Sequence, residues 1–497
     1  MMRAQFCEKT TIIVRHHFFC NFYCLIHHPW LNHDQQLNDG SAIIMRKLTE
    51  MRRQMYTPAG CCFGMVSQFL RCWRFLKLPS AFKQNEFLAN SPVRLDIFAV
   101  GTIPAHNSIM DPGVLAEIER LCSIADQKDE DAAFLVFDLS ETVERVKNWK
   151  LAMPRVDPYY AIKCNNDPLL LRTLAALNFG FDCSSKAEMD MIINLGVPPD
   201  RILYANTCKG FSHLRHAAHL NVSLMTFDSE EELLKIKQTF PTAKLLIRLR
   251  VKQSSAKIPT TDTSGCEERD VPALLEAALI HNLSVVGVSF HIGSLVQDPN
   301  DFATAIKMCG QVFEIAERKG ILMDILDIGG GFPGSKSSQD LFAAIAVSVN
   351  KAIDTHFPPD GQFQIIAEPG RCIVTTAFTL CSSIIGKKER YVDNDTEIMY
   401  IINEGVYGLF VHTIFHSDET KPTPKTLLPG VELKPSSIWG QSCDPVDLIV
   451  KRSMIPELKV GDWLLIEEMG AYTTSCASTY CGFEKTEVKY IVSQETL

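Results

Sequence analysis

Short apolar runs alternate with longer amphipathic segments from about residue 134 onward. The run FLVFDL (134–139) is followed by eight more that are nearly continuous in apolar residues, as expected for parallel strands buried on both faces. The segments between them, such as DPLLLRTLAALN (167–178) and SKAEMDMIINLG (185–196), have helical periodicity. The eight runs are YYAIK (159–163), FGFDC (179–183), ILYAN (202–206), LMTFD (224–228), LLIRL (245–249), VVGVSFH (285–291), ILDIGG (325–330) and IIAE (365–368).

This repetition predicts an α/β fold. Eight strand–helix units are typical of a (β/α)8 TIM-like barrel, which we expect over residues 139–376, and a doubly wound sheet is the alternative. The helical alternation stops after Glu368. TAFTLCSSIIG (376–386), EIMYIINEGVYG (397–408), DWLLIEEMG (462–470) and EVKYIVS (487–493) indicate strands separated by polar or Pro-rich loops. We therefore predict a β-rich C-terminal domain over residues 377–497, to which residues 96–138 contribute a strand or two.

Residues 1–95 share none of these patterns. They carry 12 Lys and Arg against 5 Asp and Glu, a charge of +7, so the remainder of the chain carries −16. They also hold six cysteines. We interpret this basic, Cys-rich segment as an extension outside the folded core, either unstructured or translated sequence outside the natural protein. An organelle transit peptide is the alternative, because the segment is basic and poor in acids.

Composition and charge narrow the class of protein. A chain of 497 residues with 46% hydrophobic and 22% charged residues is typical of a globular protein with large cores. A net charge of −9 argues against a nucleic-acid-binding surface. The chain lacks the run of about 18 apolar residues that a membrane-spanning helix needs. Its 17 cysteines are scattered and follow no convincing signal peptide, which indicates reduced thiols in the cytoplasm, and we expect no metal site.

Each predicted barrel strand ends in a polar residue or a glycine loop. Active sites of such barrels are built at the C-terminal ends of the strands. One polar residue there could simply form a turn, but eight in succession, 19 to 43 residues apart, indicate an active site. They are Lys163, Asp182, Asn206, Asp228, Arg248, His291, the loop Gly329, Gly330 and Gly331, and Glu368.

Three of these ends match the three reactive parts of pyridoxal 5'-phosphate. A lysine at a barrel mouth, Lys163, is a candidate Schiff-base nucleophile. The glycine loop 329–331 lets backbone N–H groups approach a phosphate, to which Arg371 could also bind. Glu368 could keep a ring nitrogen protonated, and His291 could stack on the ring. Taken singly, these residues are also compatible with a surface lysine, a tight turn, a local Glu–Arg pair and a core histidine.

At these residues the chain resembles the eukaryotic ornithine decarboxylases. The resemblance covers about residues 134–494, and its motifs occur in the family's order: PYYAIKCN, FDCSSKAE, GVSFHIGS, LDIGGGFPG, IIAEPGR, GVYG, SSIWGQSCD and GDWLLIEEMGAYT. It implies a barrel and a β domain, pyridoxal phosphate as cofactor, and an obligate homodimer with shared active sites. It also implies decarboxylation of L-ornithine to putrescine, a step of polyamine biosynthesis.

The resemblance assigns roles to individual residues. Lys163 would bind the aldehyde of the cofactor, Glu368 would pair with the pyridine nitrogen, and His291 would stack on the ring. Ser294, Gly331, Arg371 and Tyr472 would hold the phosphate, and Asp182, Glu188 and Arg248 would line the cofactor side. Cys443 and Asp444 would come from the partner subunit. Cys443 would steer protonation after loss of CO2, and Asp444 would bind the distal amine of the substrate.

The chain departs from the family pattern in three places. Phe415 and His416 stand where the family has a Tyr-Asp pair, whose aspartate helps to bind the distal amine; Asp418 could replace it only if the loop shifts. PTTDTSG (259–265) replaces a basic stretch, so that Thr263 stands in place of a lysine that pairs across the dimer with an aspartate, here Asp447. The chain also ends 25 residues after Tyr472, without the longer tail that vertebrate members use for rapid degradation.

We therefore predict an active decarboxylase that acts on ornithine and binds no nucleic acid or membrane. Two alternatives remain. The protein could be a non-catalytic regulator like the antizyme inhibitors, since residues 209–237 match the region through which the family binds antizyme. It could also decarboxylate another basic amino acid, because His416 changes the end of the site that binds the distal amine.

Overall fold

The computed structural model describes residues 97–100, 110–128, 130–251, 255–259, 263–392, 395–414, 422–425 and 430–493. All of them belong to one compact unit, residues 96–496. The prediction made for residues 1–95 lies outside the described residues.

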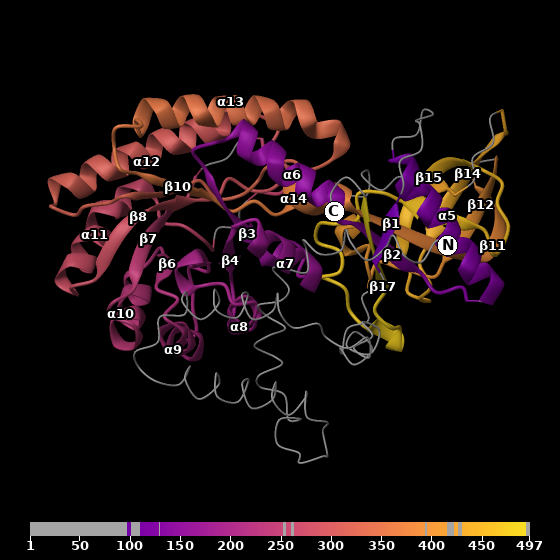
Figure 1. The fold of residues 1–497 in the computed structure, drawn as a ribbon, viewed down its shortest axis with the longest axis horizontal. Helices are drawn as coiled ribbons and strands as arrows, with labels where there is room; N and C mark the ends of the chain where they lie inside the picture. Colours follow the sequence, from indigo (N-terminus) through magenta and orange to yellow (C-terminus); the bar gives the residue numbers. More distant parts are fainter. Residues whose placement is uncertain are drawn as a thin grey trace, which may run out of the picture. The chain divides into compact units, whose positions relative to one another are not determined.

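Eight parallel strands close into a barrel in the order β10-β3-β4-β5-β6-β7-β8-β9 (Figure 1). Each strand overlaps the apolar run that predicted it, so the predicted TIM-like barrel is confirmed. The strands are β3 (Asp157–Ala161), β4 (Gly180–Cys183), β5 (Ile202–Tyr204), β6 (Leu224–Phe227), β7 (Lys244–Leu249), β8 (Ser284–Phe290), β9 (Ile325–Asp327) and β10 (Gln364–Ala367).

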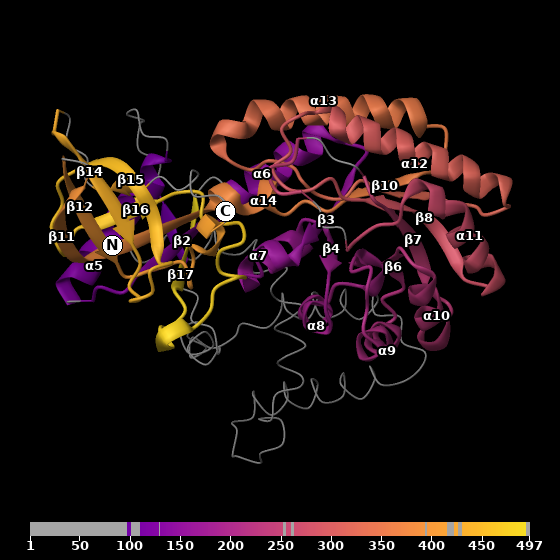
Figure 2. The same cartoon turned by 180° about the vertical axis from the view of Figure 1, so that it is seen from behind.

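Helices follow the strands and surround the barrel (Figures 1 and 2). Several begin at side-chain caps: Ser185 caps α8 and Ser229 caps α10, each two residues after a strand end, and Asp167 caps α7 after the turn that follows β3. These caps fix where each loop at the mouth of the barrel stops. The helices are α6 (Leu139–Ala152), α7 (Pro168–Ala176), α8 (Lys186–Asn194), α9 (Phe211–Leu220), α10 (Glu230–Thr239), α11 (Val271–Ile280), α12 (Asn300–Arg318), α13 (Gln339–His356) and the short α14 (Arg371–Val374).

The interior of the barrel is packed with side chains. One buried cluster joins residues of six strands: Tyr159, Leu203, Leu224, Leu246, Ile325 and Ile366, together with Ala205. Strands on opposite sides of the ring can share such a cluster only through its interior, so the barrel is filled and is not a pore. The loops at the C-terminal ends of the strands therefore sit on a closed, rigid base.

The second part of the fold is a nine-stranded sheet in the order β1-β17-β2-β11-β12-β14-β15, with β16 beside β11 and β13 beside β16. Helix α5 (Pro112–Lys128) packs on it through Ile118 and Cys122, which share a buried cluster with Trp463. The strands are β1 (Ile97–Val100), β2 (Phe134–Asp138), β11 (Phe378–Val392), β12 (Asp395–Ile402), β13 (Pro422–Pro424), β14 (Leu433–Trp439), β15 (Leu448–Pro456), β16 (Trp463–Ile466) and β17 (Glu487–Ser493). A β-rich domain after the barrel is thus confirmed, although β13, β14 and β15 were not predicted, and β13 lies in a Pro-rich segment that was expected to be a turn. Among the described helices, none is both long and apolar enough to cross a membrane.

Candidate active site

A pocket of about 580 Å³, partly open to solvent, lies at the C-terminal ends of the barrel strands. Six of the eight strands of the ring, all except β4 and β6, contribute residues at or just after their C-terminal ends, and the segment after β16 adds a tyrosine. The pocket brings together nine of the residues predicted from the sequence: Lys163, Arg248, His291, Ser294, Gly330, Gly331, Glu368, Arg371 and Tyr472.

Lys163 reaches the pocket from a single 3-10 turn (Ile162–Cys164) that directly follows β3. Its amine donates a hydrogen bond to Asp182, the third residue of β4, and the two form an ion pair. Burial alone would lower the pKa of the Lys163 amine, but the carboxylates of Asp182 and Glu368 outweigh it and raise that pKa above its ordinary value. The Lys163 amine is therefore charged as long as it contacts these acids and no other group.

The turn after β4, the strand that carries Asp182, is fixed by two side-chain contacts at the start of α8. Ser185 Oγ accepts a hydrogen bond from the Glu188 N–H at 3.3 Å, and Glu188 Oε2 accepts one from the Ser184 N–H at 2.5 Å. Burial raises the pKa of Glu188. Glu188 does not line the pocket but holds the turn that follows Asp182. Asp182 itself is fully buried, and its Oδ1 has no hydrogen-bond partner.

Two buried carboxyl groups lie at the ends of two paired strands, and only one of them, Glu368, lines the pocket. Glu368 directly follows β10 and Asp327 ends β9, and they are 8% and 0% exposed. Burial raises the pKa of Glu368 well above its usual range, and the charges of Asp327 and Asp182 add to this effect. Burial likewise raises the pKa of Asp327 to about 6. Sequence reasoning missed Asp327, although the run ILDIGG contains a lone acid in an otherwise apolar strand.

His291 follows β8 and accepts a hydrogen bond at Nδ1 from the Gly330 N–H, at 3.0 Å. Because Nδ1 is the acceptor, the ring proton sits on Nε2. Burial lowers the pKa of His291 to about 3, and the charges of Arg248 and Lys163 contribute in the same direction. The imidazole is therefore neutral throughout the physiological pH range.

The other end of the pocket is built to receive an anion. Gly331 has φ +114°, and a Cβ there would lie 2.6 Å from the Gly293 carbonyl oxygen, so this turn requires glycine. The Arg371 guanidinium lies over the Tyr472 ring, 5.1 Å from its centre, and its Nε is buried without a hydrogen-bond partner. The backbone N–H of Tyr472 donates to the Cys164 carbonyl at 2.8 Å, which anchors this segment beside Lys163.

This donor set fits pyridoxal phosphate. A buried guanidinium N–H without a partner, beside a glycine turn and Ser294, is suited to bind a phosphate. The amine of Lys163 and the carboxyl of Glu368 line the same pocket, so the aldehyde and the ring nitrogen of the cofactor each have a matching group. Among the residues that the structure describes, no group of three or more His, Cys, Asp or Glu is arranged to hold a metal ion.

Three of the predicted strand-end residues serve loops instead of lining the pocket. Asn206 Oδ1 accepts the Cys208 N–H at 3.3 Å, and Asp228 Oδ2 accepts the Gly265 N–H at 2.7 Å. Gly329 donates its N–H to Asp327 Oδ1 at 2.9 Å and supports the turn below the pocket. These contacts show that some polar residues at strand ends are turn formers, the simpler of the two interpretations. His416 and Asp418 lie outside the described residues.

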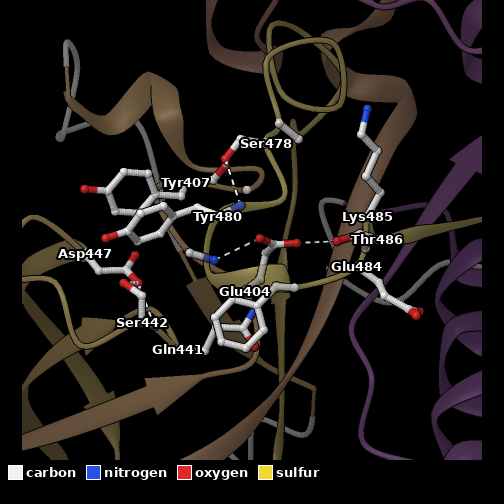
Figure 3. A pocket seen from close by; sticks show the side chains of 14 residues that line it. Glu404, Tyr407, Gln441, Ser442, Asp447, Ser478, Tyr480, Glu484, Lys485 and Thr486 are labelled. Atoms are coloured by element: carbon white, nitrogen blue, oxygen red, sulfur yellow. Dashed lines mark hydrogen bonds between the residues drawn. The ribbon is translucent and has the colours of Figure 1, made fainter.

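Cys443 and Asp444 lie in the β domain, on the loop between β14 and β15, and neither lines the barrel pocket. Cys443 is exposed, and Asp444 Oδ2 accepts a hydrogen bond from the Tyr407 hydroxyl at 3.0 Å. Beside them is a second pocket, where the Tyr407 and Tyr480 rings stack with centres 4.1 Å apart (Figure 3). Its central acid, Glu404, accepts hydrogen bonds from the Gly405 N–H and the Thr486 hydroxyl.

Asp447, expected to face a partner subunit, is used inside this chain. It is 2% exposed and accepts hydrogen bonds from the Val406 N–H at 2.7 Å and from the Ser442 N–H and hydroxyl at 2.9 and 2.5 Å. Its carboxylate therefore holds the loop that carries Cys443 and Asp444, and the change to Thr263 does not leave Asp447 without donors.

Comparison with known proteins agrees with this geometry. The pyridoxal binding domain of pyridoxal-dependent decarboxylases matches residues 139–375. The ornithine decarboxylase of Rattus norvegicus is 41% identical over 78% of this chain and 87% of its own length. The antizyme inhibitor 2 of Xenopus laevis is also 41% identical, over 77% of this chain and 86% of its own. The crystal structure of the arginine decarboxylase of Paramecium bursaria Chlorella virus is 34% identical with a TM-score of 0.72, over 76% of this chain and all of that one.

These similarities extend over both the barrel and the β domain, and they are high enough to define the family. Together with the pocket that holds Lys163, Glu368 and Arg371, they show that the chain belongs to the ornithine decarboxylase family of pyridoxal phosphate-dependent amino-acid decarboxylases.

Proposed function

We propose that this protein is an active enzyme that decarboxylates L-ornithine to putrescine and so supplies polyamine biosynthesis. The observation that supports this most directly is the complete set of cofactor groups in one pocket. Lys163, Glu368 and Arg371 lie at the mouth of the barrel with His291 and Tyr472 between them. The amine of Lys163 faces this pocket and forms an ion pair with Asp182, which is fully buried.

The residues of the chain divide the chemistry among them. Bound pyridoxal phosphate supplies an electron sink for the electron pair left when CO2 departs. Lys163 would bind the aldehyde end of the cofactor through its amine. Burial and two neighbouring acids raise the pKa of Glu368, so its carboxyl would share a proton with a ring nitrogen more readily than an exposed acid would. The neutral imidazole of His291 packs on the ring without adding a charge.

The substrate end of the site comes from a second copy of the chain in this proposal. Cys443 and Asp444, which the resemblance assigns to protonation and to the distal amine, are absent from the lining of the barrel pocket. They lie on a loop held by Asp447, and Tyr407 orients the Asp444 carboxylate. Because this loop does not line the pocket of its own chain, it can act only in the pocket of another subunit. The protein would then be a homodimer with shared sites. The distal cation of a basic amino acid suits a carboxylate such as Asp444.

Complementation tests this shared site. Lys163→Ala and Asp444→Ala are each expected to be inactive, since each destroys both sites of its own homodimer. Mixed and allowed to exchange subunits, they should recover up to about one quarter of wild-type activity, because half of the dimers are then heterodimers with one intact site of two. Mixtures that stay inactive, although native mass spectrometry shows that heterodimers have formed, would exclude the shared site while leaving the cofactor assignment intact.

Two other functions compete. The similarity to antizyme inhibitor 2 and the match of residues 209–237 to the antizyme-binding region favour a regulator that binds antizyme. The similarity to an arginine decarboxylase and the presence of His416 favour a different basic amino acid. The eleven cysteines described in the structure form no disulfide, which supports a reducing compartment such as the cytoplasm for any of the three.

A decarboxylation assay separates the three functions. CO2 release from ornithine, lysine and arginine is measured with and without added pyridoxal phosphate, and Lys163→Ala serves as the inactive control. Ornithine should have the highest kcat/KM and yield putrescine. A preference for lysine or arginine would replace the substrate assignment. Binding of pyridoxal phosphate without turnover of any of the three, together with capture of purified antizyme, would favour the regulator.

A further inference from the structure

The glycine loop after β9 is joined by three hydrogen bonds to three groups around the pocket. The Gly329 N–H donates to Asp327 Oδ1 at 2.9 Å, and the Gly329 carbonyl accepts from the Glu368 N–H at 2.7 Å. The next N–H, of Gly330, donates to His291 Nδ1 at 3.0 Å. Two consecutive peptides thus contact an acid of β9, the acid after β10 and the imidazole after β8.

The close approach of the loop to its neighbours requires residues without side chains. Gly329 has φ +61°, and a Cβ there would lie 2.0 Å from the Phe290 carbonyl oxygen. At Gly330 a Cβ would lie 2.7 Å from the Glu368 carbonyl oxygen and 3.2 Å from His291 Cε1. With no side chains to anchor it, the orientation of this segment depends on hydrogen bonds to its peptides.

Asp327 supplies the side-chain anchor. It is fully buried, one of its oxygens accepts the Gly329 N–H, and its carboxyl also interacts with the side chains of Glu368 and Ser289. It does not line the pocket. A buried carboxyl in this position can therefore hold both the glycine loop and Glu368.

We propose that Asp327 is a positioning residue, which aligns the Gly329–Gly330 peptides and thereby fixes His291 as its Nε2–H tautomer and Glu368 in its place under the cofactor ring. The glycine loop then does more than approach a phosphate. It links a buried acid to His291 and Glu368, the two groups that would contact the cofactor ring. This role belongs to the empty protein as well as to the loaded one, so it does not depend on ornithine being the substrate.

The test compares Asp327→Asn and Asp327→Ala in the full-length protein. Asparagine keeps an oxygen that can accept the Gly329 N–H, and alanine does not. The tautomer of His291 is read from nitrogen chemical shifts of ¹⁵N-histidine-labelled, cofactor-free protein, in which His291→Gln identifies the signal. Affinity for pyridoxal phosphate is measured by fluorescence titration. We expect wild type and Asp327→Asn to hold the Nε2–H tautomer with affinities within about threefold, and Asp327→Ala to mix tautomers and bind at least about tenfold more weakly.

Asp138 provides a matched control. It also ends a strand, β2, its Oδ1 accepts the N–H two residues on at 2.9 Å, and burial likewise raises its pKa to about 6. Asp138→Ala should leave both the tautomer and the affinity unchanged, because this aspartate lies in the nine-stranded sheet. An Asp327→Ala protein with wild-type tautomer and affinity would overturn the proposal. An Asp327→Asn protein that mixes tautomers and binds as weakly as expected for Asp327→Ala would overturn it as well. If Asp327→Ala does not fold, the wild type still tests the proposal, because an Nδ1–H tautomer of His291 there would overturn the proposal.

Discussion

At the scale of single residues, the pocket contains groups whose pKa values are displaced in opposite senses by the same burial. His291 is held neutral, with a pKa lowered to about 3, whereas Asp327 and Glu368 are held protonated to higher pH than usual. Low dielectric disfavours whichever form is charged, so a base loses its proton and an acid keeps its own. A site that must accept a neutral ring face and protonate a ring nitrogen needs this combination.

The neutral state of His291 predicts a loss of stability in acid. An unfolded histidine binds a proton as the pH falls below about 6.5, whereas the folded one, with a pKa of about 3, does not. Its contribution to the free energy of unfolding is therefore complete above pH 6.5 and declines as the pH falls toward 3, by at most about 2 kcal/mol at pH 5. Cofactor-free His291→Gln lacks this term, so its unfolding free energy in urea should fall less than that of the wild type between pH 8 and pH 5. Equal pH dependence in the two proteins would contradict a buried neutral His291.

The same residues show what the sequence reveals about a site. Lys163, His291 and Glu368 were predicted because each breaks an apolar run at its C-terminal end, where a barrel places its chemistry. That pattern does not separate residues of the pocket from turn formers, so Asn206 and Asp228 were predicted with them. It also passed over Asp327, because its proximity to Glu368 depends on the pairing of β9 with β10, which brings together residues far apart in the chain.

At the scale of elements, the loop after β9 depends on backbone conformations that only glycine adopts easily. Gly331→Ala places a methyl group 2.6 Å from the Gly293 carbonyl at φ +114°, so the turn must shift away from the phosphate end of the pocket. We expect affinity for pyridoxal phosphate to fall at least about tenfold, with a loss of about 1–3 kcal/mol of stability. Both are measured, by fluorescence titration and by urea unfolding.

Gly320→Ala is the control that distinguishes a loss of stability caused by backbone strain from a loss of affinity for the cofactor. Gly320 follows α12, has φ +76°, and a Cβ there would meet nothing within 4 Å. Gly320→Ala should therefore cost about 1 kcal/mol of stability without changing the affinity for pyridoxal phosphate. If both variants lost affinity equally, the proposed role of the Gly331 turn would be wrong.

Elements differ in how visible they are in the sequence. The barrel strands were predicted because both of their faces are buried, which makes them continuous apolar runs. Strands β14 and β15 were not, since they lie at one edge of the nine-stranded sheet and their buried and exposed positions do not alternate regularly. The ladder between them also has two irregular steps, at Ser436 and at Ile438, which break the period of two.

At the scale of the whole molecule, the two ends of the described chain meet in one sheet. Strands β1 and β2 precede the barrel, yet β1 pairs with β17 and β2 pairs with both β17 and β11, which follow it. Neither end can complete the sheet until the barrel between them has brought them together. Local patterns predicted that residues 96–138 contribute strands, but they gave no partner for them, because parallel pairing across more than 350 residues leaves no local signal.

Because β1 pairs with β17, shortening the chain at its N-terminal end tests which residues the fold needs. A chain that starts at Asp96 keeps β1 beside β17, so we expect its unfolding free energy and its affinity for pyridoxal phosphate to equal those of the full chain. A chain that starts at Gly101 loses the parallel ladder of Ile97–Val100 and leaves an edge of β17 uncovered, at a cost of about 1–3 kcal/mol. Since β1 does not line the pocket, the folded fraction should still bind the cofactor normally. Equal stability of the two truncated chains would show that β1 contributes nothing, and loss of folding in the longer one would show that residues 1–95 belong to the core.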